Sequence, residues 1–146
     1  MSAVEERWRE RQVRFEDGIA WVDDEFAELC GAPGEGFRAD LRLPVARLIQ
    51  FAPDGWTNVE ERCVAEGGDF TVYAGETSAE GAGFVAVEQK STGRLLWVLH
   101  LSNAEPFVEV ACDGQTVRAV SEEYPNRWVW RIPVDAPEEL TAVAAR

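Results

Sequence analysis

The sequence has 146 residues, a length that fits one domain, residues 1–146, with a substantial core. Its 27 acidic residues outnumber its 14 basic ones, and the net charge of −13 repels phosphate backbones and anionic lipid, so we expect neither nucleic acid nor a membrane as partner. The three cysteines are widely spaced, which argues against a disulfide framework or a structural zinc site. Because the N-terminus is charged and no apolar run is long enough for a bilayer, we expect a cytoplasmic protein.

The N-terminal segment predicts a short helix followed by a hairpin. Ser2 and Glu5 have the spacing of a capping box, which favours a helix over residues 3–11. Asp17-Gly18 is a strong signal for a two-residue hairpin loop. It joins two apolar-containing segments, 13–16 and 19–22.

Residues 23–51 carry weaker signals. Phe26, Leu29 and Cys30 have the spacing of a short helical turn, and residues 31–36 form a loop rich in glycine and proline. Alternation over residues 40–45 predicts a strand at an edge, because Pro44 cannot donate a hydrogen bond. Residues 46–51 are expected to form a further strand.

The central part of the chain predicts the middle of a sheet. Strands are expected over residues 58–65 and 70–74, joined by a turn at 67–69, with a loop over 75–83. In the hairpin of residues 83–101, the strand Arg94–Leu101 is apolar on both faces. We therefore expect it to be a central strand covered on both sides, with Leu95, Trp97, Leu99 and Leu101 on one face.

The C-terminal third predicts more short strands. They are expected over residues 107–111, 116–121 and 127–132, and residues 140–145 read as a last strand or a short helix. The pattern favours a mainly β fold, a twisted antiparallel sheet that closes into a sandwich or partial barrel, with a short N-terminal helix.

Few residues have the spacing that catalysis requires. His100 is the only histidine, and although Ser102 can share its strand face, no Gly-x-Ser-x-Gly elbow is present. The acidic pairs within residues 23–25, 122–123 and 105–109 are more often solvated surface than metal or glycosidase sites. We therefore assign no catalytic residue, metal site or cofactor, and we expect a protein that is not an enzyme.

The six tryptophans are a compositional excess that can serve binding. Trp21 and Trp97 fall within apolar strands and are expected in the core. Trp128 and Trp130 lie two apart on one strand face, where an aromatic pair either covers the end of the sheet or anchors a partner.

The chain between residues 17 and 40 carries −6 of the net charge. An acidic surface of this kind either aids solubility or steers a basic protein by long-range attraction. The candidate partner-binding residues are Asp23, Asp24, Glu25, Glu28, Glu35, Trp128 and Trp130.

A small, acidic, β-rich chain without a catalytic constellation resembles in type the immunity proteins of bacterial toxin–immunity pairs. That resemblance implies a non-catalytic protein-binding module that neutralises a basic toxin by occluding its active site. The alternative is a β domain that binds a small ligand or a carbohydrate through Trp56, Trp128 and Trp130. The sequence does not define the oligomeric state.

Overall fold

We analysed a computed structural model that describes residues 1–79 and 81–145. The protein is mainly β, with short helices at the N-terminus and after the fifth strand. In chain order the elements are α1 (Ala3–Arg9), β1 (Gln12–Arg14), β2 (Gly18–Trp21), β3 (Glu25–Ala32), β4 (Gly36–Ala39), β5 (Leu43–Pro44), α2 (Val45–Phe51), β6 (Trp56–Gly67), β7 (Phe70–Thr77), β8 (Gly83–Gln89), β9 (Arg94–Leu101), β10 (Phe107–Cys112), β11 (Thr116–Glu123), β12 (Asn126–Pro133), the 3-10 helix η1 (Pro137–Glu139) and β13 (Thr141–Ala144).

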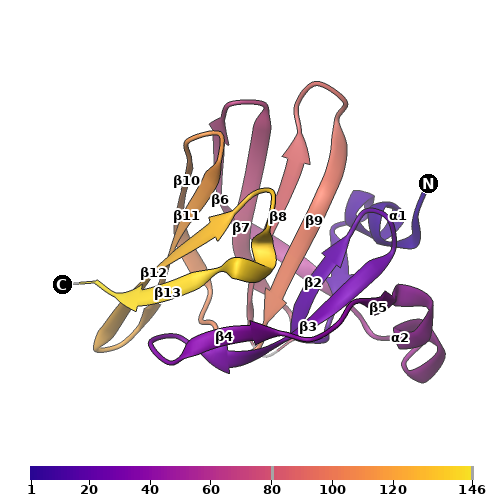
Figure 1. Cartoon of the computed structure of the whole chain (residues 1–146), viewed down its shortest axis with the longest axis horizontal. Helices are drawn as coiled ribbons and strands as arrows, with labels where there is room; N and C mark the ends of the chain where they lie inside the picture. Colours follow the sequence, from indigo (N-terminus) through magenta and orange to yellow (C-terminus); the bar gives the residue numbers. More distant parts are fainter. Residues whose placement is uncertain (80, 146) are drawn as a thin grey trace.

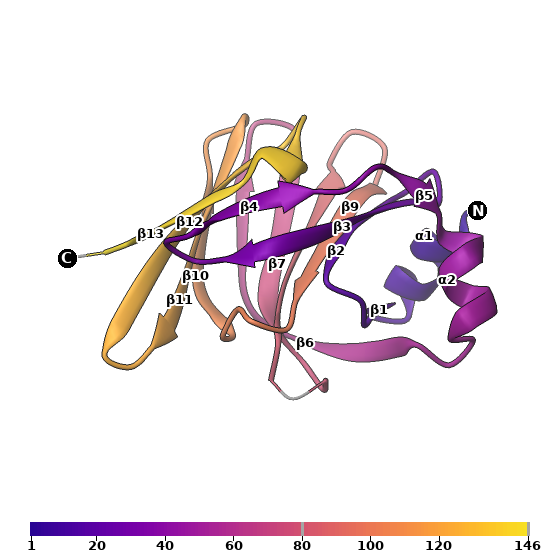
Figure 2. The ribbon, with the colours of Figure 1, turned by 60° about the horizontal axis from the view of Figure 1, so that its bottom comes forward.

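Within the described residues the strands form two antiparallel sheets. The larger has nine strands in the order β1-β6-β7-β8-β9-β2-β3-β4, with β5 beside β3, and the smaller has four in the order β10-β11-β12-β13. The small sheet lies against one face of the curved large sheet, and α1 and α2 lie together away from it (Figure 1). The expected β sandwich is therefore confirmed, and the sheet does not close into a barrel across the described chain (Figure 2).

Two apolar clusters cover the two faces of the large sheet. The first lies between the sheets and includes Trp97, Phe107 and Trp130. The second lies beneath α1, where the Trp8 ring contacts Phe84 at a centroid distance of 6.1 Å. Together they explain why the middle strands have no face exposed to solvent.

The strand Arg94–Leu101 has the predicted bounds and lies inside the large sheet as β9, between β8 and β2. Trp97, Leu99 and Leu101 share the face toward the small sheet, as predicted. Leu95 belongs to the opposite cluster, so its predicted face is wrong. The register shift places Val87 opposite Trp97 but Glu88 opposite Leu95, which makes Leu96 an extra residue that reverses the alternation.

The predicted hairpin around Asp17-Gly18 is wrong. Strand β1 pairs with β6, whereas β2 pairs with β3 and β9. Gly18 lies inside β2, where a Cβ atom would collide with the Ala27 carbonyl. Pairing with distant strands has overridden the local turn signal.

Two predictions between residues 26 and 51 are also wrong. The expected helical turn at residues 26–30 is part of β3, because Phe26 and Leu29 are buried on opposite faces of that strand. The expected strand over residues 46–51 is the helix α2, and the strand over 40–45 is reduced to the two residues of β5. Val45 at the start of α2 is fully buried in the cluster beneath α1, so packing selects the helix.

The remaining predictions agree with the structure apart from their ends. Ser2 caps α1 by accepting the Glu5 N–H at 3.1 Å, although the helix ends at Arg9 rather than at residue 11. Strands β6, β7 and β10 to β12 contain the predicted ranges, and the last segment is the strand β13. The expected loop over 75–83 is shorter, since β7 reaches Thr77 and β8 begins at Gly83, and Glu80 lies outside the described residues.

The two sheets approach each other at both ends of the small sheet. Near β10 the Gly67 backbone is so close to Cys112 that a Cβ atom at Gly67 would overlap the Cys112 carbonyl. Near β13 the Gly34 N–H donates to the Ala142 carbonyl at 3.0 Å. These seams hold the small sheet over the core.

Candidate functional site

The five acidic residues predicted to face a partner lie in the turn between β2 and β3, in β3 itself and in the turn between β3 and β4. Asp24 is engaged in the fold, because its carboxylate accepts the N–H groups of Ala3 at 3.1 Å and Val4 at 3.0 Å. A carboxylate at this position neutralises the positive end of the helix dipole and satisfies two free donors. Asp24 therefore contributes to the N-terminus of α1.

The other four acidic side chains do not form one patch. Asp23 lies in the turn before β3 and accepts the Glu25 N–H at 3.2 Å. Glu25 and Glu28 are three positions apart in β3 and so point to opposite faces. Glu35 lies in the turn between β3 and β4.

Glu28 is part of a small cluster on the outer face of β3. Ligand atoms of Glu28, Cys30 and Asp40 lie within 4.8 Å of one another. Glu28 and Asp40 are exposed and Cys30 is half-buried, and the Cys30 thiol donates to Glu28 Oε1 at 3.6 Å. Exposed acidic groups of this kind are common without an ion, and we assign no metal to it.

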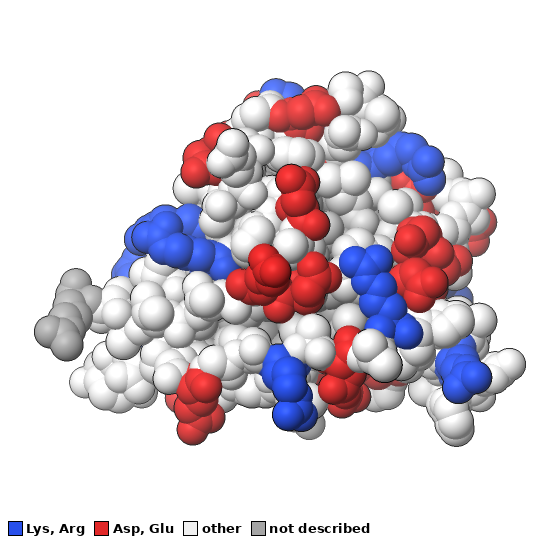
Figure 3. All heavy atoms as spheres, in the orientation of Figure 1, with Lys and Arg blue, Asp and Glu red and all other residues white. Residues whose placement is uncertain are grey.

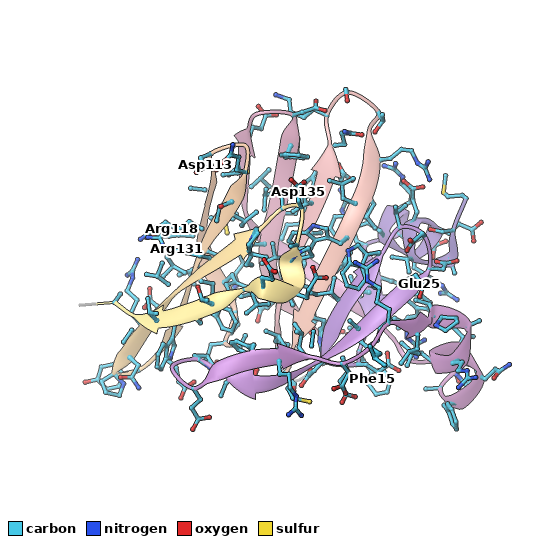
Figure 4. The ribbon with its side chains drawn as sticks, in the orientation of Figure 1. Phe15, Glu25, Asp113, Arg118, Arg131 and Asp135 are labelled. Atoms are coloured by element: carbon cyan, nitrogen blue, oxygen red, sulfur yellow. The ribbon has the colours of Figure 1, made fainter. Side chains whose placement is uncertain are left out.

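A second acidic segment, which sequence reasoning did not select, lies beside β4 and β12. Asp135, Glu138 and Glu139 belong to η1 and the turn before it, and Arg42 beside β5 pairs with Glu138 at 3.5 Å. Figure 4 labels Asp135 and Glu25 in one view, and Figure 3, in the same orientation, shows carboxylate groups over η1 and, beyond a basic side chain, toward the start of β3. We call the residues Glu25, Asp135, Glu138 and Glu139 the acidic face. The sequence signal for this segment is the acidic run after Pro133.

Trp128 and Trp130 share one strand face as predicted, and that face is the inner one. Trp130 is fully buried, and its indole N–H donates to Ser121 Oγ at 2.8 Å. Its ring contacts Phe37 and Phe107 at centroid distances of 5.3 and 5.4 Å. Trp128 is half-buried against the same core. The structure thus places Trp130 in the core, with no ring surface exposed to a partner.

A polar network surrounds the single histidine, which is itself buried. His100 Nε2 lies 3.4 Å from the Thr77 hydroxyl, and His100 Nδ1 lies 3.6 Å from Asp17 Oδ1. The Asp17 carboxylate also accepts the Ser102 N–H at 2.7 Å and the Ser102 hydroxyl at 2.6 Å. Sequence reasoning paired His100 with Ser102 but missed Asp17, which holds the two together from the start of β2.

The pKa of Asp17 reflects this environment. Burial raises the pKa, but the neighbouring His100 imidazole and the hydrogen bonds from the Ser102 hydroxyl and N–H lower it by more, so the net shift is downward. The carboxylate is therefore held in its charged form at neutral pH.

The order of hydroxyl, imidazole and carboxylate is that of a nucleophilic triad, but the geometry is that of a structural network. Thr77 and His100 are both buried, both contacts to the imidazole are long, and the Thr77 hydroxyl also accepts the Ala79 N–H at 3.3 Å. A nucleophile needs access to substrate and a short bond to its base. We conclude that the network joins β2, β7 and β9.

Beside this network lies a cavity of about 10 Å³, enough for about one water molecule. Arg14 and His100 both line it, and each has one buried nitrogen that finds no hydrogen-bond partner among the residues that the structure describes. Arg14 is otherwise satisfied, since its guanidinium binds Glu16 in a bidentate pair at 2.9 and 2.8 Å. A water here would accept from Arg14 and bond to His100.

Comparison with known protein families, with curated proteins and with solved structures gave no match. Across the described residues no helix combines the length and the hydropathy needed to cross a membrane. The function must therefore be argued from the surface itself.

Proposed function

We propose that this chain is a non-catalytic protein-binding module whose partner is basic and docks on the acidic face. The observation that carries the proposal is the group of carboxylates on the face over η1, which continues past a basic side chain toward Glu25 of β3, a segment far away in the sequence (Figures 3 and 4). Gathered like charges repel one another, so a basic partner stabilises them and is steered toward them.

An exposed apolar side chain next to this face supports the proposal. Leu41 is 92% exposed in the connection between β4 and β5, directly before Arg42, which pairs with Glu138. Protein interfaces combine an apolar contact with a charged rim, and Leu41 supplies such a contact beside the acidic face. Partner binding would bury it.

The mode of action that we propose is occlusion. The resemblance in type to immunity proteins suggests that the partner is a toxin and that the acidic face covers its basic active-site region. A protein of this kind needs a complementary rigid surface and no catalytic group. The segment that leads into η1 is anchored to β9, since the Trp97 indole N–H donates to the Val134 carbonyl at 2.9 Å.

The test is affinity capture from the native cell lysate at low salt, followed by a salt gradient and mass spectrometry. We expect one basic protein to be recovered in stoichiometric amount and released by salt. The triple variant Glu25→Gln, Asp135→Asn and Glu139→Gln should lose it. A control of equal charge change, Glu60→Gln, Glu105→Gln and Glu123→Gln, should retain it. Equal recovery with both variants, or no partner at all, would contradict the proposal.

A second candidate function rests on an apolar depression at the other end of the molecule. Phe15, Pro53 and Trp56 line an open hollow of about 410 Å³ beside α2. The guanidiniums of Arg7 and Arg14 stack on the Trp56 ring at 5.1 and 4.8 Å. This hollow would take a small apolar or sugar-like ligand. Titration with such ligands should change tryptophan fluorescence in the wild type but not in Trp56→Phe; an equal change in both would exclude the hollow as the site.

A further inference from the structure

Two arginines face each other on the outer surface of the small sheet. Arg118 of β11 is directly opposite Arg131 of β12, and both are exposed (Figure 4). The Val134 N–H donates to the Gln115 carbonyl, which sets the alternation of hydrogen-bonded pairs along these strands. By that alternation the arginines occupy a non-hydrogen-bonded pair, where Cα atoms are about 4.5 Å apart and side chains approach most closely.

This placement is unfavourable in the protein alone. Like charges directly opposite on neighbouring strands destabilise a sheet. Among the described residues, no carboxylate lies within 4.0 Å of either guanidinium, although the chain has 27 acidic residues. On the same sheet, Arg127 is paired with Glu109 at 2.8 Å and Glu122 at 3.4 Å. Among the described residues, Arg127 therefore has two carboxylate partners, whereas Arg118 and Arg131 have none.

The arginines line a shallow depression of about 220 Å³ together with Thr116 and Asp113. Asp113 is the acidic group in this lining, and its Oδ1 accepts the N–H groups of Gln115 and Thr116, each at 2.8 Å. It stabilises the turn between β10 and β11. Its charge works against an anion in the depression, so the two guanidiniums must outweigh it.

We propose that Arg118 and Arg131 bind a small doubly charged oxyanion of the phosphate type. Two guanidinium forks offer planar, bidentate donors to phosphate oxygens, and the Thr116 side chain lies on the same strand face as Arg118. The net charge of −13 disfavours long polyanions, so the ligand is a small molecule or a single phosphate group. The site is separate from the acidic face and does not depend on the function proposed for that face.

The test is a titration of the isotopically labelled protein with inorganic phosphate at constant ionic strength, with chloride as the reference salt. We expect saturable shifts of the Arg118 and Arg131 side-chain NH signals and a rise in melting temperature with phosphate. The double variant Arg118→Gln/Arg131→Gln should bind phosphate at least about tenfold more weakly, since each lost charge-assisted bond costs about that factor.

The matched control is Arg38→Gln/Arg47→Gln, which removes two exposed arginines elsewhere and should leave phosphate affinity unchanged. The melting temperature of both double variants without phosphate shows that each is folded. Equal phosphate shifts in wild type and in Arg118→Gln/Arg131→Gln would overturn the proposal. So would a linear response that chloride reproduces, or saturation by citrate without saturation by phosphate.

Discussion

Single buried side chains connect segments that are far apart in this chain. The Glu5 carboxylate in α1 accepts the Leu95 N–H of β9 at 3.1 Å and the Arg94 guanidinium at 3.1 Å. The Trp8 indole in the same helix donates to Glu88 of β8 at 2.7 Å. Because such groups are buried, removal of one partner leaves the other without a hydrogen bond. The attachment of α1 therefore depends on a few residues.

Glu5→Gln should make stability less dependent on pH. Burial by itself raises the pKa of Glu5. The hydrogen bonds from Leu95 and Arg94 lower the pKa by a larger amount, so it lies below its ordinary value. A folded pKa below the unfolded one stabilises the protein at neutral pH, and this contribution is lost as pH falls through the folded pKa. We expect Glu5→Gln to cost about 1 to 3 kcal/mol at pH 7. The difference from wild type should shrink below about pH 4 in urea unfolding.

The control for this measurement is Glu6→Gln, one residue along α1 and exposed. It should leave both the free energy of unfolding and its pH dependence close to wild type. A loss at Glu5 that stays constant from neutral to acid pH would contradict the assigned charge state.

Trp130→Ala should be among the most destabilising single substitutions. The ring is fully buried between the sheets, and its removal leaves a cavity and an unpaired Ser121 hydroxyl. We expect a loss of about 3 to 5 kcal/mol in free energy of unfolding, measured by denaturant titration. Tyr124→Ala, at an exposed aromatic in the turn between β11 and β12, is the comparison and should change stability little. A small effect at Trp130 would show that its ring is not part of the core.

At the scale of elements, the molecule depends on how the edges of the small sheet meet the large one. The β10 edge rests on β6 and β7 through the close approach of Gly67 and Cys112. The β13 edge is held to the turn before β4 by the bond from Gly34 to Ala142. Neither seam is a continuous strand ladder, so a local change in backbone spacing affects the whole sandwich.

Gly67→Ala should separate the sheets at the β10 seam. The added methyl group overlaps a backbone carbonyl, which cannot move aside as a flexible side chain would. We expect a loss of about 1 to 3 kcal/mol and faster hydrogen exchange of β10 amides. Gly93→Ala serves as comparison because its Cβ meets open space and only its positive φ of 69° is strained. If Gly93→Ala costs as much as Gly67→Ala, the close approach at the seam has no special role.

At the scale of the whole molecule, excess negative charge opposes compaction. A net charge of −13 on a chain of 146 residues produces self-repulsion that the folded state must overcome. Surface ion pairs such as Arg11–Glu61 at 2.6 Å recover little of it, because exposed pairs are worth about 1 kcal/mol or less. Stability should therefore depend on ionic strength.

Sodium chloride should raise the melting temperature at neutral pH. Screening shortens the range of repulsion from about 30 Å at 0.01 M salt to about 10 Å at 0.1 M. Calorimetry across this range should show a monotonic rise at pH 7 and almost none near pH 4.4, where the charges of the sequence balance. A melting temperature that falls with salt at pH 7 would mean that attractive ion pairs dominate.

The sequence predicted best those elements whose pattern and partners are local. The bounds of β9 were predicted correctly because its apolar residues and the neighbouring loop mark both ends of the strand. The hairpin of β10 and β11 was also predicted, because its two strands are neighbours in the sequence. The Asp17-Gly18 hairpin failed because β1 and β2 pair with β6 and β9, which no local pattern reveals. The predicted face of Leu95 was wrong because the extra residue Leu96 reverses the alternation of side chains in β9.

The candidate surface was harder to predict than the fold. The excess of acidic residues in the sequence identified the acidic segment. It did not reveal that the Asp24 carboxylate binds the N-terminus of α1, or that Glu25 and Glu28 point to opposite faces of β3. The acidic face draws on η1, which packs beside β4, an element far away in the sequence that no local pattern places there. Trp128 and Trp130 were paired correctly, but a period of two does not distinguish the inner face of a sheet from the outer.

The pairing of β2 with β9 has a consequence for the newly made chain. Ile19 lies opposite Leu99, so the β2 and β3 strands leave the ribosome long before the neighbour that completes their sheet. Until then one edge of β2 is unpaired and its apolar residues are exposed to solvent. An unpaired edge and exposed apolar residues favour aggregation with other chains. Synthesis in the cell should therefore be a more demanding step for this protein than refolding of the finished chain at high dilution.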